Sequence, residues 1–275
     1  MSYAAGVVIP LLRQDDRWLE RALRSALVQS ARCEVIVVPS PHTPPSNLAL
    51  VEDMRRRAPG RLVVASPPVS GFPCAVNTGF GLARAERVGL LLSDDWLEPT
   101  AVEECLEISA DVVSTGLRSV AADGSDLPHL SRRLDMESFL KRRTLERRAA
   151  YLTHFLLFSR SKVYSIGGLD ETLGETPGID DYDLIWTLLE HGATVGITGR
   201  PLYNYRVHRG DRLTLRSREE QTRTLSRIFD KHGVRDPERA QLVERQAVWF
   251  GRCEDVVYAE RRAAFTGTPA RGNRS

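Results

Sequence analysis

Short apolar runs alternate with segments of helical periodicity along the first half of the chain. Residues 6–10 and 34–38 are runs rich in Val and Ile, each bounded by a proline, which is typical of strands buried on both faces. From Trp18 to Leu27, apolar residues recur at spacings of three and four, with Arg and Glu at the positions between. That spacing predicts an amphipathic helix.

The alternation continues as far as residue 92. Helices are predicted over residues 48–57 and 75–84, and strands over residues 61–65 and 88–92. Such an alternation favours a parallel sheet with right-handed crossovers, in which ligands bind beyond the carboxyl ends of the strands. We therefore predict an α/β fold with a Rossmann-like, mostly parallel central sheet flanked by helices, and we expect the chemistry in loops that follow strands.

The second half of the chain is less regular. Its patterns predict strands over residues 111–115, 155–158 and 194–197, helices over residues 135–148 and 180–191, and a loop over residues 121–131. Beyond Arg212 the pattern is almost wholly helical, and the last ten residues are rich in Gly, Pro, Arg and Ser. We expect a main domain over residues 1–211, a C-terminal helical extension over 212–265 and a flexible tail over 266–275.

Composition narrows the classes of partner. The 275 residues are 42% hydrophobic, enough for a buried core, and 38 basic against 36 acidic residues give a formal net charge of +2. That balance predicts no nucleic-acid partner. The four cysteines are widely spaced, which favours buried free thiols over a zinc site. No apolar run reaches the length of a membrane span and no secretion signal leads the chain, so we expect a cytoplasmic location.

Two adjacent acids follow the strand predicted at residues 88–92. Asp94 and Asp95 would be held at the edge of the sheet, where carboxylate oxygens suit a Mg²⁺ or Mn²⁺ ion that bridges two phosphates. An acid after a strand also commonly caps the next helix. The pair alone favours neither interpretation.

A second acidic cluster lies at the start of a predicted helix. Asp180, Asp181 and Asp183 fall within four positions, and capping at the helix dipole explains one or two acids there more easily than three. A carboxylate held at the mouth of a sheet is a natural general base for an acceptor hydroxyl. Further along the chain, His208 is a candidate metal ligand or a structural histidine, and Arg206 is a candidate partner of a diphosphate.

Several segments, in a fixed order, resemble family 2 glycosyltransferases, which have the GT-A fold. The segments are Val7–Pro10, Ala26–Ser30, Glu34–Val38, Ala75–Phe80, Leu91–Pro99, Gly167–Glu171, Asp180–Leu184 and Tyr205–His208. They extend over residues 7–208, and their order is far more specific than any one motif.

The resemblance implies an inverting enzyme that moves a sugar from a nucleotide-sugar donor to an acceptor hydroxyl. By position, it implies that Asp94 binds a Mn²⁺ or Mg²⁺ ion with Asp95 and His208 beside it, that Asp181 is the general base, and that Asp180 is the neighbouring candidate. The acceptor is expected to be a carbohydrate, a lipid-linked compound or a small molecule. The predicted donor contacts are Pro10, Ser40, Asn77, Ser93, Asp94 and Arg206.

The chain departs from the family's pattern at two donor-binding positions. Many members read Asp-Asp-Gly-Ser after the second strand, whereas this chain has Pro39 to His42, and Leu92 stands in the place of the first acid of the metal motif. Asp180 also replaces the usual Glu, with similar chemistry. Donor recognition is therefore expected to depend on backbone groups, Ser40, His42 or other residues, or on a donor other than the common uridine type.

Alternatives stay open for the whole chain and for two of its surfaces. Pro39 and Leu92 also fit a catalytically degenerate domain that binds nucleotide sugars or serves as a scaffold subunit. A nucleotidyltransferase is disfavoured because residues 10–14 are not Gly-rich. The basic series between Arg132 and Arg148 could contact an anionic acceptor or a membrane surface, or be a solvated helix face. The C-terminal helices could form a homodimer, cover the acceptor site or pack on the core.

Overall fold

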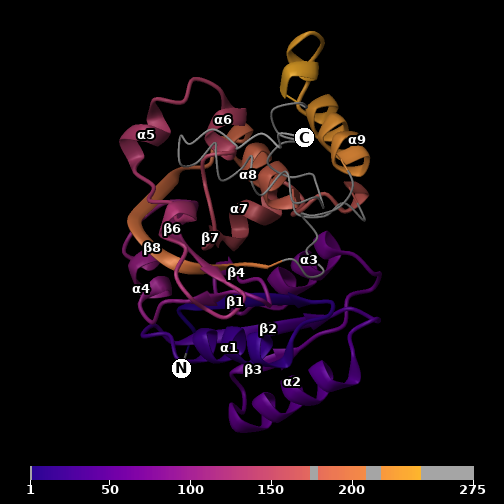
Figure 1. Cartoon of the computed structure of the whole chain (residues 1–275), viewed down its shortest axis with the longest axis vertical. Helices are drawn as coiled ribbons and strands as arrows, with labels where there is room; N and C mark the ends of the chain where they lie inside the picture. The colour runs from indigo at the N-terminus through magenta and orange to yellow at the C-terminus, as the bar shows by residue number, and fades with distance from the viewer. Residues whose placement is uncertain (1, 174–178, 209–217, 243–275) are drawn as a thin grey trace, which may run out of the picture.

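The computed structural model describes residues 2–173, 179–208 and 218–242, and it is built around one mixed sheet (Figure 1). Within these residues the sheet has eight strands in the order β3-β2-β1-β4-β7-β6-β8-β5. The fold is therefore α/β with a central sheet flanked by helices, as predicted. The strands are β1 (Ala5–Leu11), β2 (Cys33–Pro39), β3 (Leu62–Val64), β4 (Arg87–Leu90), β5 (Trp96–Leu97), β6 (Val112–Ala121), β7 (Leu156–Ser159) and β8 (Val195–Val207).

The helices cover both faces of this sheet (Figure 1). They are α1 (Asp16–Leu27), α2 (Pro45–Arg57), α3 (Phe72–Leu82), α4 (Ala101–Leu106), α5 (Met136–Leu140), α6 (Leu145–Ala149), α7 (Arg160–Ser165), α8 (Asp180–Glu190) and α9 (Arg218–Lys231). Short 3₁₀ turns lie at Pro128–Leu130 and Glu171–Leu173. The strand β5 and the helices α4 and α7 were not predicted, because elements of two or six residues carry too little periodicity to be recognised.

The first half of the sheet is parallel, as the alternating pattern predicts. β1 pairs with β2 over seven residues, from Ala5 opposite Cys33 to Leu11 opposite Pro39, and every residue of both strands is buried. Neighbouring side chains of β1 enter two different cores: Val7 packs with the α1 and α2 side, and Val8 with the α3 and α8 side. Burial on both faces explains why these strands contain no alternating polar positions.

The second half of the sheet differs from the mostly parallel prediction. β7 runs antiparallel between β4 and β6, and Leu90 of β4 lies opposite Leu156 of β7. This pairing puts the residues just before β7 at the same edge of the sheet as the residues just after β4. The loops that follow the parallel strands lie at this edge of the sheet, and residues 150–155 therefore lie beside them.

β8 is much longer than the predicted strand at residues 194–197. It continues through Pro201 to Val207, paired in parallel with β6 and, near its end, antiparallel with β5. The pairing with β6 is irregular on either side of Gly116, where a Cβ atom would come within 2.6 Å of a backbone oxygen of Arg132. Gly199, with a φ of +73°, lies in the same irregular stretch. The bulge interrupts the strand pattern, so the sequence predicted only the short strand at residues 194–197.

The predicted helix over residues 135–148 is two short helices, α5 and α6. Asp135 caps the first by accepting a hydrogen bond from the backbone of Ser138, and Thr144 caps the second by accepting from Arg147. The second cap begins a new helix inside the charged segment, which explains the break.

Helix α9 packs on the main core. Its Leu225, Ile228 and Phe229 are 0% exposed and belong to the same hydrophobic cluster as residues of α8. Of the alternatives for the C-terminal helices, packing on the core therefore holds for α9. The predicted tail at residues 266–275 lies outside the described residues. No helix in the described part of the chain combines the length and apolar character needed to cross a membrane.

Three cysteines are buried and free, as predicted for thiols without a metal or disulfide role: Cys33, Cys74 and Cys105. Burial raises the pKa of the Cys33 and Cys105 thiols to about 12, so both stay protonated and unreactive at neutral pH. Cys253 lies outside the described residues.

Candidate active site

The turn after β4 is anchored by Asp95, which is 0% exposed. Its carboxylate accepts two hydrogen bonds of 2.6 Å, from the hydroxyl of Tyr203 to Oδ2 and from the backbone N–H of Arg206 to Oδ1. Both donors lie on β8, which pairs with β5 directly after the turn. Burial and these two bonds let Asp95 fix the turn, and its predicted contact with a metal stays a prediction.

The hydroxyl of Tyr203 stays a donor to Asp95. Burial, together with the neighbouring carboxylate of Asp95, raises the pKa of Tyr203 well above its ordinary value of 10.0. The hydroxyl therefore keeps its proton, and the contact does not change across the ordinary pH range.

Asp94 and His208 meet at the same edge, although they lie 114 positions apart in the chain. The Oδ2 atom of Asp94 is 2.9 Å from Nε2 of His208, and the two side chains are 19% and 7% exposed. The ring of His208 also packs against Trp18 at a centroid distance of 4.8 Å. The structure thus joins two of the predicted metal-binding residues, next to an indole from the start of α1.

Arg206 is a buried part of this framework. It is 2% exposed, its Nε donates to the backbone oxygen of Asp94 at 3.0 Å, and one Nη donates to the oxygen of Ala122 at 2.9 Å. Its guanidinium lies 4.6 Å from the ring centre of Trp18 and 5.0 Å from that of Trp96. Burial lowers the pKa of Arg206. These contacts hold the Asp94 turn, and the predicted contact of Arg206 with a donor stays a prediction.

The three acids at the start of α8 have different surroundings. Asp180 is 2% exposed, whereas the side chain of Asp181 is 27% exposed. Oδ2 of Asp181 lies 3.0 Å from Nε2 of His154, and its Oδ1 accepts from the backbone N–H of Tyr182 at 2.9 Å. Of the two predicted candidates for the general base, Asp181 is the one that an acceptor can reach.

Asp183 is the third acid, and it attaches α9 to α8. Its side chain is 1% exposed and contacts Nζ of Lys231 at 2.7 Å and Nε2 of His232 at 3.1 Å. Lys231 also lies 3.1 Å from Asp170, and the His232 ring stacks on Trp186 at 4.0 Å. Capping of the helix did not explain a third acid, and Asp183 instead makes a buried tertiary contact between α8 and α9.

A stacked pair of rings connects the two acidic clusters. The ring of His154 stacks on Tyr203 with a centroid distance of 5.4 Å and an interplanar angle of 30°. Tyr203 in turn donates to Asp95, and His154 contacts Asp181. One continuous set of contacts therefore runs from the turn after β4 to the start of α8.

Sequence reasoning missed three residues of this site. His154 was part of an unassigned segment, Tyr203 lay beyond the predicted strand at residues 194–197, and Trp18 was treated only as an apolar residue of the predicted helix. The sequence contains one signal that could have identified His154, which is its position as a polar residue directly before the apolar run at residues 155–158.

Three predicted donor-binding residues lie at the carboxyl ends of neighbouring strands. Pro10 is in β1 opposite Val38, and the backbone N–H of Ser40 donates to the oxygen of Leu11 at 2.7 Å. The hydroxyl of Ser93 accepts from Nε2 of Gln14 at 3.4 Å. These residues surround the region where the architecture binds ligands, and their contact with a donor stays a prediction.

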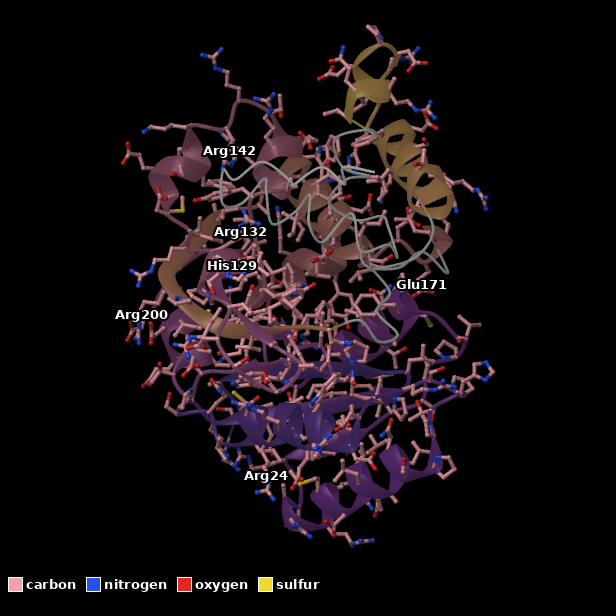
Figure 2. All side chains as sticks on the ribbon, in the orientation of Figure 1. Arg24, His129, Arg132, Arg142, Glu171 and Arg200 are labelled. Carbon is pink, nitrogen blue, oxygen red and sulfur yellow. The ribbon has the colours of Figure 1, made fainter. Side chains whose placement is uncertain are left out.

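Asn77 has a different set of contacts. Its amide donates to the oxygen of Leu169 at 2.9 Å and to Glu171 at 2.8 Å, and its oxygen accepts from the N–H of Leu169 at 2.8 Å. A Cβ atom at Gly168 would come within 2.5 Å of the Asn77 oxygen. Asn77 thus holds the turn before Glu171 (labelled in Figure 2) onto α3, and its predicted contact with a donor stays a prediction.

The pair of Asp94 and His208 fits a divalent cation chemically. A carboxylate oxygen and an imidazole nitrogen, both at the carboxyl edge of the sheet, are ordinary ligands of Mn²⁺, and the carboxylate also suits Mg²⁺. Among the described residues, no group of three or more His, Cys, Asp or Glu side chains could hold an ion. A cation at this pair would therefore complete its shell with ligands such as phosphate oxygens and water.

The basic series near α5 and α6 is partly engaged within the protein. Lys141 pairs with Glu137 at 2.6 Å, and the guanidinium of Arg142 (labelled in Figure 2) lies 4.0 Å from the ring centre of Tyr151. Arg132 donates to the backbone oxygen of Tyr151 at 3.1 Å. Contact of this face with an anionic acceptor or a membrane stays a prediction.

Comparison with other sequences places this chain in a known family. A sequence model of Glycosyl transferase family 2 matches residues 6–167, more than half of the chain. The chain is 25% identical over 252 residues to the O-antigen biosynthesis protein RfbC of Myxococcus xanthus, and 27% identical over 209 residues to the chondroitin synthase of Pasteurella multocida (strain Pm70). The matches cover 89% and 74% of this chain but only 19% and 20% of the two relatives. The chain thus spans about a fifth of their length.

Solved structures share the fold. S. aureus TarS 1–349 in complex with UDP-GlcNAc is similar with a TM-score of 0.62 and 18% identity, over 96% of this chain and 72% of that one. The mannosyltransferase PcManGT from Pyrobaculum calidifontis, in complex with GDP-Man and Mn²⁺, is similar with a TM-score of 0.63 and 16% identity, over 98% and 77%. The mixed α/β sheet described above is therefore the GT-A fold of glycosyltransferases.

Proposed function

This chain belongs to glycosyl transferase family 2 and is a glycosyltransferase, and on that premise we propose that it transfers a sugar with inversion from a nucleotide-sugar donor to an acceptor hydroxyl. The observation that carries the proposal is the meeting of the two acidic clusters at one sheet edge. Asp94 with His208 and Asp181 with His154 are connected there through Tyr203 and Asp95.

Asp94 and His208 would hold a Mn²⁺ or Mg²⁺ ion on the donor side. When bound, such an ion supplies positive charge that stabilises the departing diphosphate. The residues around the pair keep its geometry: Asp95 and Arg206 fix the turn, and Trp18 packs on His208. A preformed arrangement of this kind avoids reorganisation during the reaction.

Asp181 would be the general base on the acceptor side. Its carboxylate takes the proton of the acceptor hydroxyl while that oxygen forms a bond to the anomeric carbon, and the bond from this carbon to the diphosphate oxygen breaks. Attack from the face opposite the leaving group inverts the configuration. The partial exposure of Asp181, against the burial of Asp180, supports this assignment.

The donor is a nucleoside diphosphate sugar in this proposal, and a carbohydrate or glycolipid hydroxyl is the acceptor. The similar structures bind donors with different bases, since TarS was solved with UDP and UDP-GlcNAc and PcManGT with GDP-Man. This chain has Pro39 to His42 after β2 in place of an acidic loop. A donor screen must therefore include both uridine and guanosine nucleotides.

Transfer and donor hydrolysis are measured with a panel of UDP, GDP and dTDP sugars, each with Mn²⁺, with Mg²⁺ and with a chelator. We expect one donor class to be turned over, and Asp181→Asn to abolish turnover while calorimetry shows unchanged donor affinity. Calorimetry with wild-type protein separates this function from a scaffold role. Indifference to every nucleotide and nucleotide sugar in the presence of metal would contradict the proposal.

A further inference from the structure

We infer that His154 is a positioning residue that orients the carboxylate of Asp181 toward the acceptor hydroxyl. The inference rests on the proposed function, because it takes Asp181 as the general base. It assigns a task to a histidine that neither the acidic motif nor the donor side of the site requires. It also explains why the two acidic clusters are physically connected.

The carboxylate of Asp181 is held at both oxygens. Oδ2 lies 3.0 Å from Nε2 of His154, and Oδ1 accepts from the backbone N–H of Tyr182 at 2.9 Å. Two contacts on different oxygens fix the plane of the carboxylate, which one contact would leave free to rotate. Each carboxylate oxygen has a second lone pair, so the 27% exposed side chain can still accept the proton of an acceptor.

The tautomer of His154 follows from its surroundings. Nδ1 is buried and has no hydrogen-bond partner within the described residues, whereas Nε2 faces the carboxylate of Asp181. A neutral imidazole carries one proton, and only the Nε2–H form donates to Asp181. We therefore assign the Nε2–H tautomer, with the lone pair of Nδ1 turned into the protein.

The backbone on both sides of His154 is fixed by β6. The hydroxyl of Ser114 accepts from the N–H of Thr153 at 3.1 Å and donates to its oxygen at 2.7 Å. The hydroxyl of Thr115 accepts from the N–H of Phe155 at 2.8 Å. Ser114 and Thr115 are both 0% exposed, so His154 starts from a rigid position at the edge of the sheet.

The plane of the His154 ring is set by Tyr203. The two rings stack at 5.4 Å, and the Tyr203 hydroxyl is held by buried Asp95 at 2.6 Å. Because Asp95 also fixes the turn that carries Asp94, one buried framework sets the directions of both reactive carboxylates. A supporting layer of this kind holds reacting groups within a few tenths of an ångström of their productive position.

The test compares His154→Gln with His154→Asn. The amide nitrogen of Gln can reach the position of Nε2 and donate to Asp181, whereas that of Asn lies near the position of Nδ1 and is too short. We expect His154→Asn to lower kcat on the order of 10- to 100-fold, the range for a misplaced catalytic group, with unchanged donor affinity. His154→Gln should recover most of that loss. His129→Asn, at an exposed histidine labelled in Figure 2, is the matched control and should behave as wild type.

Two results would overturn the inference. Wild-type kcat in His154→Asn, or equal losses in the Asn and Gln variants, would show that hydrogen bonding by this side chain does not matter. Nitrogen-15 NMR of the full wild-type chain reads the tautomer directly. The His154 signals are identified by their absence from the Gln variant, whose native fold is checked by its otherwise unchanged spectrum. Finding the Nδ1–H tautomer would contradict the assignment. If Asp181→Asn keeps full activity, the proposed function fails instead, so the two failures are distinguishable.

Discussion

The turn after β4 and the start of α8 each present two adjacent aspartates, and each pair divides into one buried and one accessible acid. Asp95 and Asp180 are 0% and 2% exposed, whereas the side chains of Asp94 and Asp181 are 19% and 27% exposed. In the proposed function the same dipeptide would serve support through its buried acid and chemistry through its accessible acid in both places. Adjacent acids in an active site need not share one task.

The two pairs are held by different means. Asp94 directly precedes a buried acid, Asp95, whose hydrogen bonds tie the turn to β8. Asp181 stands at a helix start, held by its own helix and by one histidine from a distant segment. We expect the first pair to govern stability and donor binding, and the second to govern the chemical step.

The largest effect is expected within the second pair. Asp181→Asn should lower kcat by about 10²- to 10⁴-fold, the usual contribution of a general base, because the amide cannot take a proton. Asp180→Asn should change thermal stability far more than kcat, because Asp180 is buried. Transfer kinetics and thermal unfolding of both variants check this, and the reverse pattern would assign the base to Asp180.

The next effect concerns the first pair. Asp95→Ala should reduce the free energy of unfolding by about 2–6 kcal/mol, because it leaves two buried donors without their acceptor and each costs about 1–3 kcal/mol. Asp94→Ala should change that free energy by less than about 1 kcal/mol but abolish metal-dependent donor binding. Urea unfolding and calorimetry measure the two quantities. Equal stability losses would remove the distinction between the two acids.

A smaller loss is expected at the attachment of α9. Lys231→Met removes contacts with Asp183 at 2.7 Å and Asp170 at 3.1 Å, and we expect it to cost about 1–3 kcal/mol because Asp183 is buried. Lys141→Met, which breaks an exposed pair with Glu137, should cost less than about 0.5 kcal/mol. Urea unfolding compares them, and similar values would show that α9 is not held by this cluster.

The smallest effect is a pH dependence at Asp170. Burial acts to raise the pKa of Asp170, but hydrogen bonds from Thr172 and Lys231 lower it overall below its ordinary value of 3.8. A carboxyl whose pKa is lower in the folded state stabilises the fold above its unfolded value and loses that contribution as the pH falls through the folded value. Asp170→Asn should therefore be less stable than wild type near pH 6, and the difference should shrink as the pH falls below 3.8 and be lost below the lowered pKa of the folded state. Urea unfolding across this range checks it; a difference that grows in acid would contradict it.

Much of the parallel half could be predicted because its signals are local. The runs in β1 and β2 and the periodicity of α1 are set by burial of neighbouring positions, and the structure places all three close to the predicted bounds. The positions of the two acidic clusters were predictable for the same reason, since each follows or begins a regular element.

The division of tasks among the acids could not be predicted. It depends on Tyr203, His154 and Lys231, which reach the clusters only through tertiary structure. The position of His154 follows from the antiparallel register of β7, and that of His208 from a strand that continues through a bulge and a proline. No local pattern in one sequence encodes such registers.

The alignment of the candidate active site depends on one strand, β8. Tyr203, Arg206 and His208 lie within six residues on or just after β8, and each contacts the Asp94–Asp95 turn. A slip of β8 along β6 by two residues would move all three by about 6.6 Å while keeping their side chains on the same faces. The irregular pairing around Gly116 opposes that slip. This bulge, which is more than a dozen residues in sequence from Asp94 and Asp181, therefore keeps the residues of the candidate active site in register.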